Sequence, residues 1–268
     1  MTVTDTHFAG SIPGLYDRCL GPLKFQPYAE EVARRAAVFD PRHVLETAAG
    51  TGIVTEALHR ALLEAEIVAT DLNPAMLEVA AGRVHSDKVS FQPADALQLP
   101  FEDGRFELVV CQFGMMFYPH KVRSNAEARR VLSKGGHYLA VIWDRLDRNP
   151  ASQIAHEAVA NLYPDDPPSF LARMPFGYAD TARIEQDLRT AGFASVEIET
   201  VELKSLPISV SDAATGLVAG SPLRNEIEER DPDGLDRAVA AAAQALRRLD
   251  VNGHLDSRLS AHIVTATK

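Results

Sequence analysis

The chain has 268 residues, of which 46% are hydrophobic and 24% are charged, so it is long enough to fold around a sizeable apolar core. Its formal net charge of −10 would repel a phosphate backbone, and we therefore expect no nucleic-acid partner. No run approaches the roughly 20 apolar residues that a membrane-spanning helix requires. Residues 1–10 lack a basic patch followed by an apolar segment, so we expect no secretory signal and a cytoplasmic location.

The residues that most often bind metals are sparse or scattered. The two cysteines, Cys19 and Cys111, cannot form a zinc site by themselves, and the nine histidines show no His-x-x-x-His spacing. Cys111 lies inside an apolar run, where a cysteine usually behaves as a small buried hydrophobic residue. We therefore expect no metal site.

The first 25 residues are rich in glycine and proline, and we expect an irregular segment with ordered turns there. A helix should begin at Pro27, because Tyr28, Val32 and Ala36 recur at helical spacing and proline suits a first helical turn.

Residues 43–52 then predict a buried strand, a tight turn of small residues and the start of a helix. The apolar residues Val44 and Leu45 precede Glu46, and Gly50 and Gly52 follow it. Glycine permits backbone angles that other residues avoid, and small residues let a ligand approach the backbone. The free N–H groups at the start of the following helix would favour a negatively charged group.

A second buried strand is predicted over residues 66–71, and it ends in Asp71, 19 residues beyond Gly52. An acidic side chain at about this distance from a glycine turn can accept hydrogen bonds from both hydroxyls of a ribose. Asn73 and Pro74 then predict the N-cap and first turn of a helix. A capping role for Asp71 is the alternative, although Asn73 fits that role better.

Three further strands are expected over residues 89–93, 106–111 and 137–144. The second of these is almost continuously apolar, as a central parallel strand should be. Gly135 and Gly136 are expected to supply the left-handed C-terminal cap of the helix that precedes the third strand.

The second half of the chain carries weaker signals. Helices are expected over residues 150–162 and 179–191, and strict alternation over residues 196–203 predicts a strand with one wet face. Residues 208–255 should interrupt the sheet with a helical segment, in which residues 232–249 form an amphipathic helix. Residues 262–266 should form the last strand.

This order of motifs resembles the class I S-adenosylmethionine-dependent methyltransferases, in particular the small-molecule, UbiE-like (methyltransferase type 11) kind. Residues 46–52 match the first motif of that family, Glu/Asp-x-Gly-x-Gly-x-Gly, with Ala48 in place of the first glycine. Alanine there would narrow the turn only slightly, so we expect the site to remain. Residues 71–77 match the second motif closely, and the resemblance covers roughly residues 11–144.

The resemblance implies an α/β, Rossmann-like fold with a seven-stranded, mostly parallel sheet, the last strand antiparallel and helices on both faces. It implies a single domain over residues 1–268. Within it, residues 1–40 would form an arm and helix over the cofactor site, residues 41–145 the cofactor-binding half, and residues 146–268 a C-terminal half with a helical cap at about 208–255. The cap is expected to be a substrate lid or a dimer contact.

The resemblance also assigns roles in binding S-adenosylmethionine. Glu46 would orient the methionine ammonium, Asp71 would hold the ribose, and Asp95 would accept from the adenine amino group, unless Asp95 only forms a turn. Tyr16 would line the pocket or merely pin the arm to the core. The full expected set of cofactor-binding residues is Tyr16, Glu46, Ala48, Gly50, Thr51, Gly52, Asp71, Leu72, Met76, Asp95, Ala96 and Gln112.

The chemistry implied is an in-line displacement, for which the protein mainly aligns the reacting groups. A base is needed only if the acceptor must lose a proton. His120 and Asp144 are the candidates, with a surface or capping role as the alternative for each. The Met- and Phe-rich residues 113–117 would suit an apolar acceptor or would pack in the core.

We therefore predict methyl transfer to an oxygen, nitrogen or carbon atom of a small molecule, by a monomer or a homodimer. One alternative is a protein that binds S-adenosylmethionine or S-adenosylhomocysteine without methylating. Another is a nicotinamide-dependent oxidoreductase, but its Gly-x-Gly-x-x-Gly fingerprint would require glycine where Thr55 stands. A nucleic-acid methyltransferase would need a base-stacking motif after the fourth strand, and Gln112 and the three residues that follow it do not fit one.

Overall fold

A computed structural model describes residues 12–268, and these residues divide into two compact units. The sheet unit consists of Tyr28–Trp143, Tyr178–Val201 and Ala261–Lys268. The helical unit consists of residues 12–27, Asp144–Gly177 and Glu202–Ser260. Each unit combines segments that are distant in sequence. No helix in the described part of the chain is long and apolar enough to cross a membrane.

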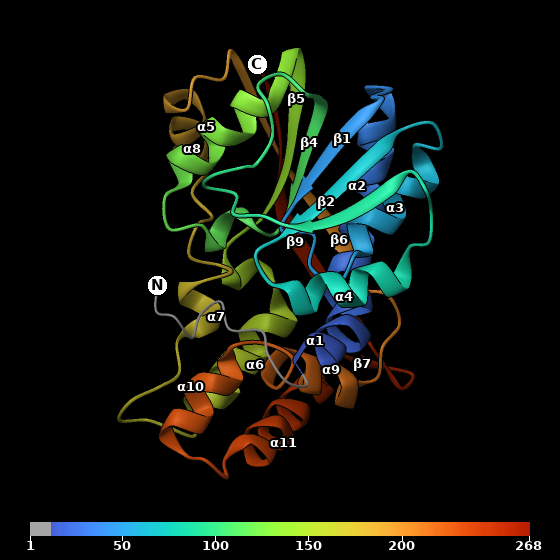
Figure 1. Ribbon diagram of the computed structural model, residues 1–268. Coiled ribbons are helices and arrows are strands. Elements are labelled where there is room, and N and C mark those ends of the chain that lie inside the picture. Colours follow the sequence, from blue (N-terminus) through green and yellow to red (C-terminus); the bar gives the residue numbers. More distant parts are fainter. Residues whose placement is uncertain (1–11) are drawn as a thin grey trace. The chain divides into compact units, whose positions relative to one another are not determined.

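The sheet has seven strands in the order β3-β2-β1-β4-β5-β9-β6 (Figure 1). The first five strands in the sequence pair in parallel, and β9 pairs antiparallel with β5. This confirms the predicted fold class, a Rossmann-like sheet with its last strand antiparallel. The strands are β1 (His43–Thr47), β2 (Glu66–Asp71), β3 (Val89–Pro93), β4 (Phe106–Gln112), β5 (Leu132–Trp143), β6 (Ser195–Lys204) and β9 (Arg258–Thr267).

Helices cover both faces of this sheet, α2 and α3 on one face and α5 and α8 on the other (Figure 1). The start of α4 has the cap that the sequence predicted. The Asn73 side chain accepts a hydrogen bond from the Ala75 N–H at 3.0 Å and caps α4, whose first residue is Pro74. The helices are α2 (Gln26–Val38), α3 (Ile53–Ala61), α4 (Pro74–Arg83), η3 (Met115–Phe117), α5 (Lys121–Val131) and α8 (Thr181–Thr190).

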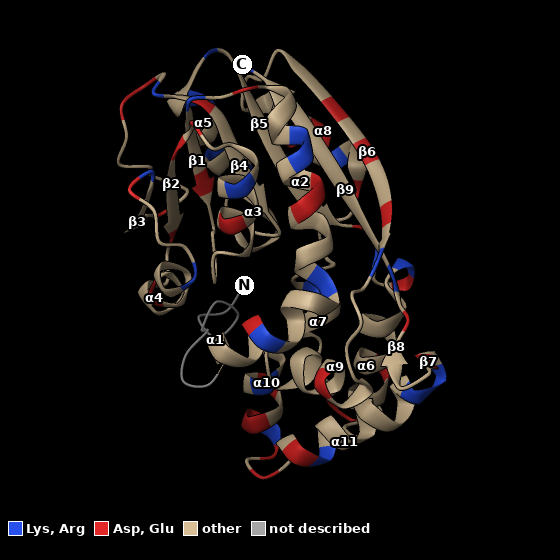
Figure 2. Cartoon of the chain, turned by 90° about the vertical axis from the view of Figure 1, so that its right-hand side faces the viewer, with Lys and Arg blue, Asp and Glu red and all other residues tan. Residues whose placement is uncertain are grey.

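The outer strand β6 carries a row of acidic side chains, Glu197, Glu199 and Glu202 (Figure 2). All three are exposed, and Ile198 and Val201 between them are half-buried. Thr200 is exposed as well, so the strict alternation predicted over residues 196–203 holds as far as Glu199 and is broken at Thr200. Charge on an edge strand discourages pairing with another chain.

The helical unit contains most of the inserted segment that the sequence predicted over residues 208–255. That segment is helical, as expected, but it ends in the short antiparallel hairpin β7–β8, which the sequence analysis did not anticipate. The elements of this unit are α1 (Ile12–Leu15), η2 (Tyr16–Phe25), η4 (Leu146–Arg148), α6 (Pro150–Ala160), α7 (Phe170–Arg173), α9 (Val210–Val218), α10 (Leu223–Arg230), α11 (Leu235–Leu246), η5 (Arg247–Leu249), β7 (Asp250–Val251) and β8 (His254–Leu255).

The prediction of an irregular segment was wrong for residues 12–25, which form the helix α1 and the π-helix η2. Cys19, Leu20 and Leu23 of η2 are buried. The segment packs so closely on α9 that a Cβ added to Gly216 would lie 2.7 Å from the Cβ of Cys19. Burial of these side chains outweighs the weak helical propensity of a glycine- and proline-rich segment.

The two glycines at residues 135 and 136 also differ from the prediction. Helix α5 ends at Val131, and Gly135 lies inside β5 with φ +76°, where the register against β4 shifts. A Cβ on Gly136 would approach the Glu107 carbonyl oxygen to 3.0 Å. These glycines therefore form an irregularity in the strand rather than the cap of the helix.

Candidate cofactor site

The turn between β1 and α3, residues 48–52, holds three residues in the left-handed region of backbone space. They are Ala48 at φ +54°, Gly50 at +56° and Gly52 at +80°. The left-handed conformation costs a residue with a Cβ about 1–2 kcal/mol. The departure from the family motif at Ala48 therefore produces backbone strain, whereas the sequence analysis had expected only a slight narrowing of the turn.

The two glycines serve different purposes. A Cβ on Gly50 would meet no atom within 4 Å, so the space beside this residue is open and the backbone is accessible there. A Cβ on Gly52 would lie 2.9 Å from the Cβ of Ala80, so this glycine allows α3 and α4 to approach each other. Only Gly50 thus offers bare backbone to a ligand.

Asp71 joins the end of β2 to this turn. One carboxylate oxygen accepts from the Gly50 N–H at 2.9 Å, and the other accepts from the Asn73 N–H at 2.8 Å. Burial raises the pKa of Asp71 above its ordinary value, although backbone amides oppose the shift. Each carboxylate oxygen can accept a second hydrogen bond, so both can still receive a vicinal hydroxyl of a ribose. The residues present thus fit the nucleoside half of S-adenosylmethionine.

The side chain of Glu46 lies in the interior of the sheet unit and is 1% exposed. Its carboxyl accepts from the Thr55 hydroxyl at 2.6 Å. The pKa of Glu46 is raised to about 8, chiefly by burial; the Thr55 hydrogen bond opposes this shift, and the nearby Asp71 carboxylate adds to it. A buried carboxyl of this kind would gain a charged partner from a bound ammonium group.

The register of the sheet places Glu46 and Asp71 at the same edge. Glu46 pairs with Ala69 of β2 on one side and with Val110 of β4 on the other. From β1 the chain adds β2 and β3 on one side of β1, and it then adds β4 and β5 on the other side. The strand order therefore reverses between β1 and β4. Ligands of open α/β sheets bind in the crevice at such a switch, beyond the carboxyl ends of the strands.

Three other predicted residues lie near these strand ends with different degrees of exposure. Leu72, next to Asp71, is 67% exposed, an unusual position for a large apolar side chain and one suited to covering a planar ring. Met76 is only 4% exposed and belongs to the core. Thr51 is 1% exposed, and its hydroxyl has no hydrogen-bond partner within the described chain.

Asp95 follows β3 and is exposed. One of its carboxylate oxygens accepts from the Leu97 N–H at 2.8 Å, so its side chain does form the turn that was the alternative interpretation. Ala96, inside this turn, is partly exposed. The turn leaves the second oxygen of Asp95 available, so the predicted contact with adenine remains a prediction.

Gln112 ends β4 and begins the segment for which two interpretations were open. Met115 and Met116 are buried, and Phe113 stacks on Trp143 with ring centroids 3.7 Å apart and planes 2° apart. These side chains pack in the core of the sheet unit, as the second interpretation had it.

The remaining candidates lie at the start of α5 and in the helical unit. His120 is exposed at the start of α5, and its side chain makes no capping hydrogen bond. Asp144 lies in the helical unit, where its carboxylate accepts from the Ser260 hydroxyl at 2.8 Å and the Arg145 N–H at 2.7 Å. Tyr16, in the same unit, stacks on Phe25 at 4.6 Å between centroids.

Two groups near the strand ends escaped the sequence analysis. Thr55, nine residues after Glu46, lies on the first turn of α3, where its hydroxyl reaches the buried carboxyl. Tyr118, in the segment after β4, donates to the Thr47 hydroxyl at the end of β1. The predicted start of a helix after Gly52 already placed Thr55 on a first helical turn, but no local pattern pointed to Tyr118.

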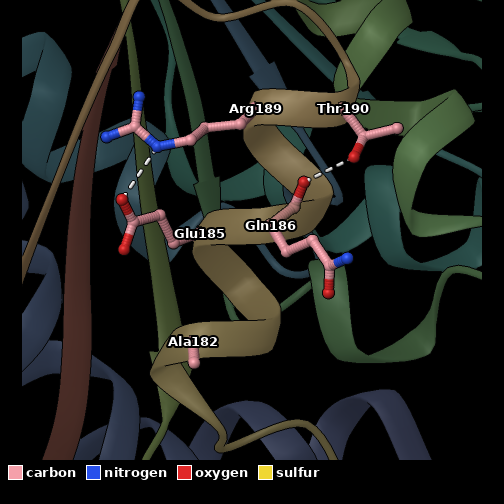
Figure 3. Close-up of a pocket in the computed structure, with 5 residues that line it drawn as sticks. All are labelled: Ala182, Glu185, Gln186, Arg189 and Thr190. Carbon is pink, nitrogen blue, oxygen red and sulfur yellow. Dashed lines mark hydrogen bonds and ion pairs between the residues drawn. The ribbon is translucent and has the colours of Figure 1, made fainter.

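Within the described residues, neither a metal cluster nor the hollow on α8 indicates a different site. Within residues 12–268, no three His, Cys, Asp or Glu side chains lie close enough to hold a metal ion. A hollow on α8 is lined by Ala182, Glu185, Gln186, Arg189 and Thr190 (Figure 3). Its charged groups pair within the helix, since Arg189 donates to Glu185 at 2.8 Å, and no residue of it belongs to the strand ends described above.

Part of the chain is similar to known methyltransferases. Residues 44–136 match the family model described as a methyltransferase domain. A demethylmenaquinone methyltransferase of Deinococcus radiodurans is 37% identical over 133 residues, which cover 49% of this chain and 53% of that protein. The chain thus spans about half the length of the curated relatives it matches.

Solved structures share the fold at low sequence identity. The phosphoethanolamine N-methyltransferase 2 of Haemonchus contortus, solved with S-adenosyl-L-methionine, is 15% identical with a TM-score of 0.62, covering 100% of this chain and 60% of that one. The [4+2]-cyclase SpnF is 21% identical with a TM-score of 0.54, covering 90% of this chain and 80% of that one. At these identities the likeness concerns the fold alone.

Proposed function

We propose that the chain is a class I methyltransferase that transfers the methyl group of S-adenosylmethionine to a small-molecule acceptor; the match of residues 44–136 to a methyltransferase domain supports this proposal. The observation that carries this proposal is the position of Asp71. Its two oxygens are fixed by the Gly50 and Asn73 amides beside an open stretch of backbone, with further hydrogen-bonding capacity for two hydroxyls.

Each group at the strand ends has a task in this proposal. Asp71 holds the ribose, and Leu72 covers the adenine, whose edge Asp95 and Ala96 bind. Glu46 orients the methionine ammonium, while Gly50 lets the cofactor approach the turn. The bound cofactor supplies an electrophilic methyl group together with its own leaving group. The protein therefore mainly excludes water and aligns the acceptor atom.

The acceptor is proposed to be a small molecule that offers an oxygen, nitrogen or carbon nucleophile. The relative from Deinococcus radiodurans is named for a quinone precursor, which makes reduced naphthoquinones the first acceptors to assay. The net charge of −10 favours an acceptor other than nucleic acid. We further propose that the protein acts in the cytoplasm as a monomer or a homodimer.

The test is calorimetric titration of S-adenosylmethionine and S-adenosylhomocysteine into the wild type, Asp71→Ala and Asp87→Ala. Asp87 is an exposed aspartate of the same unit and serves as the matched control. Losing two hydrogen bonds to a charged acceptor, each worth about 1.5 kcal/mol or more, should weaken binding by at least about 100-fold in Asp71→Ala. Asp87→Ala should bind like the wild type.

If the wild type binds neither compound, the proposed function is wrong. If it binds both, release of S-adenosylhomocysteine with an acceptor panel separates a methyltransferase from a protein that only binds the cofactor. The nicotinamide alternative predicts instead that NADH competes with S-adenosylmethionine for the site.

A further inference from the structure

Two loops meet at the carboxyl ends of β1 and β4. One is the turn of residues 48–52, and the other is the segment of residues 113–118 that follows β4. They touch so closely that a Cβ added to Gly114 would lie 2.5 Å from the Cβ of Ala48 and 2.9 Å from the sulfur of Cys111. Each loop places a residue other than glycine in the left-handed region, Ala48 at φ +54° and Phe113 at +56°.

Such backbone strain persists only where the surroundings hold it in place. The segment of residues 113–118 is held on one side by Lys121, whose ammonium donates to the carbonyls of Met116 at 2.9 Å and Tyr118 at 2.8 Å. Phe113 is held from the other side by its stacking on Trp143. Neither of these contacts reaches the turn after β1.

The Tyr118 hydroxyl reaches Thr47, the residue just before that turn. It donates to the Thr47 hydroxyl at 3.3 Å, and the Thr47 hydroxyl donates to the Val110 carbonyl at 3.4 Å. The Cys111 sulfur lies 3.4 Å from the Tyr118 oxygen. The Thr47 hydroxyl thus accepts from Tyr118 and donates to Val110, while either atom can be the donor in the pair of Cys111 and Tyr118.

We propose that Tyr118 is a positioning residue for cofactor binding, and that its hydroxyl fastens the segment after β4 to Thr47, the residue from which the turn after β1 begins. Its removal would leave the Thr47 oxygen without this donor. The strained residues 48 and 113 would then relax apart, and the turn that carries Gly50 would lose its fixed position. Burial raises the pKa of Tyr118 well above its ordinary value, so the hydroxyl keeps its proton at any working pH.

This consequence for the cofactor rests on the proposed function, but the fastening itself does not. Two readouts are therefore needed, one with ligand and one without. The variants are Tyr118→Phe and Thr47→Val, which remove the same hydrogen bond from opposite ends. Tyr28→Phe is the matched control, because it removes a buried hydroxyl that donates to the Val201 carbonyl at 2.7 Å in the same unit.

The first readout is amide hydrogen exchange of the free protein. We expect Tyr118→Phe and Thr47→Val each to speed exchange about tenfold in peptides covering residues 47–52 and 113–118. The double variant should speed exchange by less than the product of the two single effects, because the two changes share the bond between Tyr118 and Thr47. Tyr28→Phe should leave these two peptides unchanged.

The second readout is the dissociation constant of S-adenosylhomocysteine, which should rise about tenfold in both single variants and stay constant in Tyr28→Phe. Unchanged exchange in Tyr118→Phe, or additive effects in the double variant, would overturn the fastening role. Faster exchange with unchanged affinity would overturn the role in cofactor binding. A wild type that binds no cofactor would refute the proposed function and this role in cofactor binding, while the exchange data would still decide the fastening.

Discussion

Substituting Glu46 by Gln should change the pH dependence of stability. Glu46 is 1% exposed, and burial raises its pKa from 4.5 to about 8. Between these two pH values Glu46 keeps its proton in the folded protein, whereas the same carboxyl has already released it in the unfolded chain. The free energy of unfolding should therefore fall as the pH rises from about 4.5 to about 8, and glutamine, which is neutral throughout, should remove this fall.

The magnitude follows from the linkage between proton binding and stability. One proton held only in the folded state gives a slope of about 1.4 kcal/mol per pH unit. Between pH 5 and pH 7.5 the wild type should thus lose about 3 kcal/mol relative to Glu46→Gln from this group. The two proteins should have similar stability near pH 5, where both side chains are neutral.

Urea unfolding followed by tryptophan fluorescence provides the assay. Trp143 is the chain's single tryptophan, is 2% exposed, and lies in the same unit as Glu46, so its emission reports on the unfolding of that unit. The measured quantity is the difference in unfolding free energy between the two proteins at each pH, in which the other titrating groups largely cancel. Glu78→Gln, at an exposed position on α4, is the control and should give a difference that does not vary with pH.

A constant difference between wild type and Glu46→Gln from pH 5 to pH 8 would refute this reasoning. It would mean that Glu46 is ionised in the folded protein despite its burial. A difference that grows as the pH falls would contradict even the sign of the argument.

Three further predictions concern the glycine turn and the loop that touches it. Ala48→Gly should raise the free energy of unfolding by up to about 1 kcal/mol, because glycine accepts φ +54° without strain. Gly114→Ala should be destabilising, because the added Cβ would lie 2.5 Å from the Cβ of Ala48, and Ala48→Gly should restore part of the loss; additive effects in this double-mutant cycle would argue against that steric clash. Gly52→Ala should cost about 2 kcal/mol or more, from φ +80° and the 2.9 Å approach to Ala80, and an unchanged urea midpoint would contradict this.

Much of the fold follows from short stretches of the sequence. The buried strands, the capped start of α4 and the acidic ends of β1 and β2 are encoded within a few residues of each other. Parallel strands place their carboxyl ends at one edge, so the positions of Glu46 and Asp71 together could be predicted from local pattern alone. The resemblance of residues 46–52 and 71–77 to family motifs added the cofactor.

Tertiary packing decided what local pattern could not. Residues 12–25 became helical because their apolar side chains are buried, although glycine and proline oppose this locally. The pKa of Glu46 depends on how completely the folded chain excludes water around it. The contact between Tyr118 and Thr47 joins residues 71 positions apart, and the loop after β4 lies directly against Ala48. The sequence by itself determined which groups stand at the strand ends, whereas their exposure, protonation and mutual support arise from contacts between distant segments, which no local pattern encodes.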